Sequence, residues 1–128
     1  ITDANEYVLG TYMGSATETT ELAGGVYEAS ALNMPADATI VFTGNAIINL
    51  SDALTLGANT TIDDGGYIVI WNVGGALNLG AGTNFAGTAF VNGSVSGATS
   101  DVQAGGRLYA QGAVAIGSIG NTITGCSI

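Results

Sequence analysis

The chain has 128 residues, enough for one domain with a buried core. It is 47% hydrophobic and only 9% charged, with 21 glycines, no lysine, no histidine and a single basic residue, Arg107, against ten acids. The net charge of −9 argues against partners that are nucleic acids or anionic membranes, because binding either needs clustered Lys and Arg. No apolar run reaches the roughly 18–20 residues of a membrane-spanning helix, so we expect no membrane insertion.

The N-terminal segment, residues 1–21, is predicted to be an arm or a helix. Positions 1–13 fit a short helix or an extended strand equally well, and positions 14–21 are typical of a polar surface connection. The segment either covers one end of the domain or supplies an exchanged strand to another copy. The candidate contacts for such a polymer are Ile1, Tyr7, Val8, Leu9 and Tyr12.

Short strands follow from residue 22. Val26 and Tyr27 begin the first of them, and residues 34–37 are a predicted turn in which Pro35 supplies a fixed φ. From Thr39 onward the chain consists of short apolar runs, each closed by Gly, Asn or Asp. The connections are too irregular for a succession of two-residue hairpins.

A repeat organises residues 67–123. Aligning the sequence with itself one period later places Leu77 over Val95 and then over Val114, and Thr88 over Arg107. A period near 20 with short strands is typical of a parallel β-solenoid, whose coils bury their apolar sides against one another. We therefore predict a mainly β fold with solenoid coils over residues 22–123, a tail over 124–128, and four to five coils after Thr39.

Such a short solenoid has two ends. Its first and last coils expose unpaired backbone groups and apolar core, which favour edge-to-edge association unless they are capped. The C-terminal stretch NTITGCSI is uncharged and strand-like, so it caps this end poorly.

Several phrases of the sequence resemble a known family. They are Gly25-Val26-Tyr27, Thr39–Phe42, Trp71–Gly74 with Leu77 and Leu79-Gly80, Phe85–Thr88, and Gly106–Ala110 with Gly112–Val114 and Asn121–Ile123. In order and spacing, over residues 22–123, they resemble the microbial secreted ice-binding proteins. The resemblance implies a right-handed, three-faced solenoid with a helix along its side, and an ice-binding surface. The resemblance covers only the C-terminal part of the family domain, so we expect no counterpart here of the roughly half a domain of coils that members of that family carry before the helix.

Enzymatic chemistry is not expected. Without His or Lys, and with only Cys126 near the end, no Ser–His–Asp, Cys–His or Schiff-base arrangement can be assembled. The pair Asp63-Asp64 lies in DDGG, which predicts a solvated turn rather than a calcium site or a catalytic pair. We predict no cofactor and no metal, and structural roles for Trp71 as a buried aromatic and Arg107 as a partner of backbone carbonyls or of Asp101.

An ice-binding face needs regular, uncharged rows of small side chains and threonine. The candidates are Thr60, Thr83, Thr88, Thr99 and Thr122. No strict Thr-x-Thr ladder repeats at the coil period, and strand propensity alone also explains threonine here.

The sequence therefore predicts a secreted, non-enzymatic protein, extracellular or on the cell surface. The first expectation is a structural subunit that polymerises with itself head to tail into a filament or surface fibre. The alternatives are an ice-binding protein and an adhesive or carbohydrate-binding module with a glycan partner. Three sequons, at Asn49, Asn59 and Asn92, would permit glycosylation.

Overall fold

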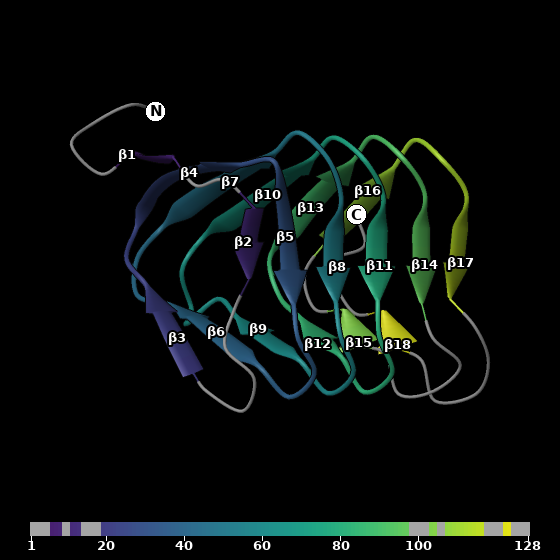
Figure 1. The fold of residues 1–128 in the computed structure, drawn as a ribbon, viewed down its shortest axis with the longest axis horizontal. Helices are drawn as coiled ribbons and strands as arrows, with labels where there is room; N and C mark the ends of the chain where they lie inside the picture. The colour runs from purple at the N-terminus through teal and green to yellow at the C-terminus, as the bar shows by residue number, and fades with distance from the viewer. Residues whose placement is uncertain are drawn as a thin grey trace.

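The fold is a stack of coils with three flat faces (Figure 1). The computed structural model describes residues 6–8, 11–13, 19–97, 103–104, 107–116 and 122–123. Each face is a parallel six-stranded sheet, and every coil contributes one strand to each. Sheet A contains β1 (Glu6–Val8), β4 (Gly25–Ala29), β7 (Ala46–Leu50), β10 (Val69–Val73), β13 (Thr88–Val91) and β16 (Arg107–Ala110). Sheet B contains β2 (Thr11–Met13), β5 (Ala31–Met34), β8 (Leu54–Leu56), β11 (Leu77–Leu79), β14 (Val95–Gly97) and β17 (Val114–Ile116). Sheet C contains β3 (Thr19–Leu22), β6 (Thr39–Phe42), β9 (Thr61–Asp63), β12 (Asn84–Phe85), β15 (Gln103–Ala104) and β18 (Thr122–Ile123).

The coil is right-handed. In Figure 1 the strands of sheet B run downward at the front while successive coils advance from left to right. This is the hand that crossover connections between parallel strands adopt almost always. The predicted mainly β, right-handed parallel solenoid is confirmed.

The N-terminal segment is built into the stack of its own chain. β1 pairs in parallel with β4, and β2 pairs with β5. With β3 they form a first coil within residues 6–22, where the sequence favoured an arm, a helix or an exchanged strand. The described residues contain no helix, and therefore none long enough to cross a membrane.

The coil length varies along the stack. Leu77 pairs with Val95 and Val95 with Val114, and Thr88 pairs with Arg107, so the predicted repeat is confirmed. Earlier coils are longer. Asn49 and its partner Asn72 are 23 residues apart, whereas Asn78 and its partner Ser96 are only 18 residues apart.

The added length follows β9, where residues 63–67 form the predicted turn. The backbone N–H of Gly65 donates to Asp63 Oδ1 over 2.8 Å, and that of Gly66 donates to Asp64 Oδ1 over 2.9 Å. Both carboxylates therefore serve the turn itself, as the DDGG sequence predicts.

The core runs along the axis between the three sheets. In the middle coils, alternate residues of the strands point inward, and these inward positions are almost all apolar. Trp71 is completely buried, as predicted, and its ring meets Phe42 edge-on at 5.8 Å and Phe85 at 5.6 Å between centroids. The three aromatic side chains thus form one cluster inside the stack.

Candidate functional site

The predicted threonine face does not form among the described residues. Thr60 and Thr83 are completely buried and lie inside the corner between sheets B and C. Thr88 is on sheet A, and Thr122 is on sheet C. Thr99 lies outside the described residues. The four described threonines therefore do not share one surface.

The burial of Thr60 and Thr83 has a local cause. The residues before them, Asn59 and Gly82, have φ values of 57° and 71°, and this left-handed corner turns the next side chain inward. Thr83 Oγ1 donates to the Gly80 carbonyl over 2.7 Å, and Thr60 Oγ1 donates to the Gly57 carbonyl over 3.0 Å. Each hydroxyl closes its own corner, so it is unavailable to ice.

The uncharged small side chains gather on the outer face of sheet B. Ser96 Oγ donates to Asn78 Oδ1 over 2.9 Å, and Asn78 Nδ2 donates to Thr55 Oγ1 over 3.3 Å. These residues form one row along the stack. Ala76 and Ser94 precede Asn78 and Ser96 by two positions in the chain, and their carbonyls accept hydrogen bonds from the backbone N–H groups of Leu54 and Leu77 in the coil before. The sequence reasoning missed this row because its members differ in type and share only the coil period.

A groove of about 840 Å³ runs along the outer face of sheet A, toward the corner with sheet B. One side is the row Glu28, Asn49, Asn72, Phe90 and Tyr109, whose members are paired from strand to strand. The other side is the corner row, which carries Ser30, Ser51, Asn92 and Gln111. We call this feature the sheet A groove.

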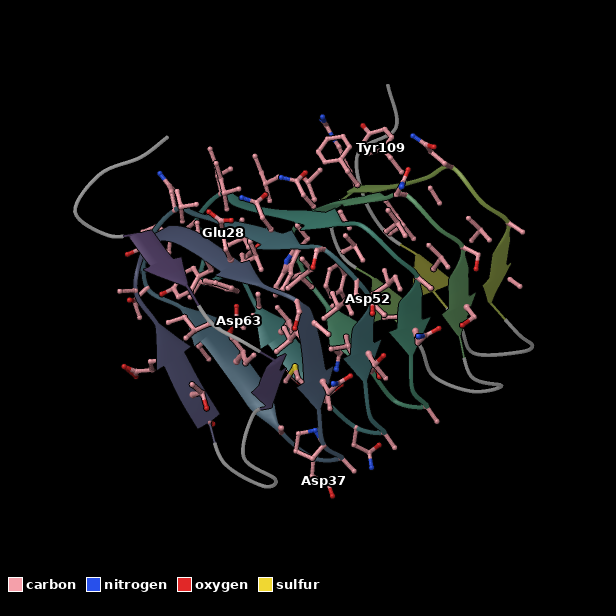
Figure 2. All side chains as sticks on the ribbon, turned by 45° about the horizontal axis from the view of Figure 1, so that its top comes forward. Glu28, Asp37, Asp52, Asp63 and Tyr109 are labelled. Atoms are coloured by element: carbon pink, nitrogen blue, oxygen red, sulfur yellow. The ribbon has the colours of Figure 1, made fainter. Side chains whose placement is uncertain are left out.

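The aromatic end of the sheet A groove is formed by Phe90 and Tyr109. Their rings stack with centroids 5.1 Å apart and planes inclined by 9°. The two side chains remain 46% and 45% exposed, although both are large and hydrophobic. In Figure 2 Tyr109 projects from the molecule near one end of the stack, and Glu28 lies toward the other end.

Amide side chains form the middle of the sheet A groove. Asn72 Nδ2 donates to Asn49 Oδ1 over 2.8 Å. Asn49 and Asn92, the asparagines of two of the predicted sequons, both border the groove. The third sequon residue, Asn59, is exposed at a corner and donates from Nδ2 to Asp37 Oδ1 over 3.2 Å.

The N-terminal end of the stack carries the predicted polymer contacts. Tyr7, Val8 and Tyr12 lie on β1 and β2, at the edges of sheets A and B. Ile1 and Leu9 lie outside the described residues.

The opposite end of the stack carries Arg107 and Val114. Arg107 is exposed at the start of β16, and Asp101, its predicted partner, is outside the described part of the chain. Val114 continues an inward row in which Leu54, Leu77 and Val95 are completely buried, yet it is 52% exposed. This end therefore presents apolar surface to water.

No cluster of three or more His, Cys, Asp or Glu that could hold a metal ion occurs in the described ranges. Comparison with known proteins finds no matching family model, no similar curated protein and no similar solved structure. The β-solenoid arrangement is therefore established from the structure of this chain alone.

Proposed function

We propose that this protein is an extracellular structural subunit that assembles with itself, head to tail, into a filament. Stacking of one solenoid on the next would continue all three sheets from copy to copy. Such a contact joins different surfaces of the two copies and does not close into a ring, so it propagates.

The observation that carries the proposal is the charge at the two ends of one row. Following the strand register from pair to pair, the row on sheet A reads Glu6, Val26, Ile47, Ile70, Thr88, Arg107. It begins with an acidic residue and ends with the only basic residue of the chain. An added copy that continues the sheet in register brings its Glu6 next to Arg107 of the copy before it, about one strand spacing of 4.8 Å away.

The apolar rows favour the same arrangement. Tyr7 begins the row that ends at Leu108, and Tyr12 begins the row that ends at the half-exposed Val114. Stacking in register would set these residue types side by side and remove apolar surface from water. Main-chain hydrogen bonds along three strand edges would add to the affinity.

A charge-swap series tests the contact between copies. Arg107→Glu is expected to raise the critical concentration for fibres about tenfold or more, because an attractive neighbour pair becomes repulsive. Glu6→Arg with Arg107→Glu should restore fibres, since the swapped charges again meet across the junction. The measurement is electron microscopy and sedimentation over a concentration series.

The double variant distinguishes a contact of Glu6 with Arg107 between two copies from a contact within one copy. β1 and β16 occupy opposite ends of the stack, so the two positions cannot compensate each other inside a single chain (Figure 1). Failure of the double variant to assemble, with the wild type forming fibres and all variants folded by circular dichroism, would overturn this register. A wild type that stays monomeric at high concentration would overturn the filament itself.

Ice binding is the second candidate, and the outer face of sheet B favours it. The residues in and beside its outer row are Asn33, Ala53, Thr55, Ala76 and Asn78, which carry no charge and repeat at the strand spacing. This is the surface type expected from the resemblance to secreted ice-binding proteins. Ice-crystal shaping by chains held monomeric through Arg107→Glu would favour this function. If these chains do not shape ice crystals, the filament remains the proposed function.

A further inference from the structure

We propose that the sheet A groove is a binding site for a neutral oligosaccharide, with one sugar ring stacked on Phe90. The site is formed within a single copy on the outer face of sheet A, although Tyr109 lies on β16, whose free edge the filament would use. It therefore does not depend on self-assembly.

The hydrogen-bonding side of the sheet A groove is suited to sugar hydroxyls. The bond between Asn49 and Asn72 uses one amide oxygen and one amide nitrogen. Asn49 Nδ2 and Asn72 Oδ1 take no part in this bond and have no hydrogen bond of their own within the described residues, so the pair keeps one free donor and one free acceptor. Vicinal hydroxyls both donate and accept, which matches such a pair. Glu28 adds a carboxylate acceptor at one end, and Asn92 and Gln111 add amides from the corner row.

The aromatic end is suited to the apolar face of a sugar ring. Phe90 and Tyr109 are neighbours along the stack, and their planes are nearly parallel. Tyr109 therefore covers one face of Phe90, and the other face is on the side of Asn72, the preceding residue of the row. A ring stacked there would contact Phe90 through its C–H groups and reach the amides with its hydroxyls.

Other classes of occupant fit the groove poorly. An anion would approach a chain of net charge −9 and a groove bordered by Glu28, without Lys, Arg or His among its lining residues. A peptide strand needs a free sheet edge, but the backbone groups here are already paired between coils. A purely apolar ligand would bury the amides without partners. The volume of about 840 Å³ lies within the usual range for small-ligand sites.

The test is calorimetry with tetrasaccharide probes, made from glucose, xylose or mannose in β-1,4 linkage, and an oligogalacturonate as the anionic comparison. The protein is produced without glycosylation and checked by intact mass, because Asn49 and Asn92 border the groove. Phe90→Ala and Asn72→Ala should each weaken binding of a neutral probe about tenfold or more. Tyr67→Ala is the matched control, since Tyr67 is 45% exposed but lies outside the groove.

Binding of at least one neutral probe that is lost in Phe90→Ala and Asn72→Ala, and retained in Tyr67→Ala, would support the site. The proposal is overturned if no neutral probe binds at millimolar concentration, if only the anionic probe binds, or if the groove variants bind like the control. The groove variants are expected to fold, because Phe90 and Asn72 are exposed, and circular dichroism checks this. Loss of sugar binding in chains that still form fibres would separate this site from the filament contact.

Discussion

Hydrogen bonds from single side chains stabilise the corners of the coil. Thr83 shows this most clearly, because its hydroxyl lies within 2.7 Å of the Gly80 carbonyl and 3.3 Å of the Gly57 carbonyl. It also lies 3.5 Å from the hydroxyl of Thr60, so two consecutive corners are joined inside the core. A threonine that looks like a surface residue in the sequence is thus part of the packing.

Thr83→Val keeps the shape of the side chain but removes this hydroxyl. We expect the free energy of unfolding to fall by about 1–3 kcal/mol, because the partly buried Gly80 carbonyl loses its partner. Thr61→Val, on the outer face of sheet C, should change it by less than about 0.5 kcal/mol. Urea unfolding of both variants makes the comparison, and equal effects would contradict the structural role of the Thr83 hydroxyl.

At the scale of elements, the coils approach closely where glycines lie on top of one another. A Cβ at Gly80 would stand 2.6 Å from the carbonyl carbon of Gly57 and 2.7 Å from the Leu56 oxygen, both backbone atoms. The strand-to-strand spacing therefore depends on the absence of a side chain at this corner. The turn glycine Gly66 is different, since its φ of 84° favours glycine but the space around it is open.

Substituting alanine at these two glycines distinguishes the destabilisation caused by a close contact from that caused by backbone strain. Gly80→Ala should destabilise the protein by about 3 kcal/mol or more, since two backbones must move apart. Gly66→Ala should cost about 1–2 kcal/mol, the strain of a left-handed residue alone. Thermal or urea unfolding measures both, and a Gly66 variant less stable than the Gly80 variant would refute the close-contact explanation.

For the whole molecule, the C-terminal end of the stack differs from the middle in how well the core is covered. The inward row through Leu77 and Val95 is completely buried until β17, where half of Val114 meets water. One more coil would cover it, and a second copy supplies one in the proposed filament. The net charge of −9 opposes association in every orientation, so the Glu6–Arg107 pair and the buried apolar surface must outweigh this repulsion at the junction.

Lysine on β17 tests this end directly. Val114→Lys should prevent or strongly weaken fibre formation, because a charge would have to be buried at the junction. Ala115→Lys, on the same strand but facing outward, should assemble normally. Electron microscopy at matched concentrations decides between them, and fibres from the Val114 variant would show that this end is not the interface.

The sequence by itself determined the parallel solenoid, its repeat after Leu77, the DDGG turn and the burial of Trp71. These depend on local patterns: alternation along short strands, glycine at corners, and the same residue types returning after one coil. Only the tertiary structure decided which residues lie side by side in rows along the stack. The coil length falls from 23 residues after Asn49 to 18 residues after Asn78, so a single repeat length does not predict which distant residues are neighbours. The tertiary structure turned Thr60 and Thr83 into the core through left-handed corners, and it aligned Asn72 with Phe90 in one groove. It likewise set Glu6 and Arg107 at the two ends of one row. No local sequence pattern predicts this, because their alignment depends on the length of every coil between them.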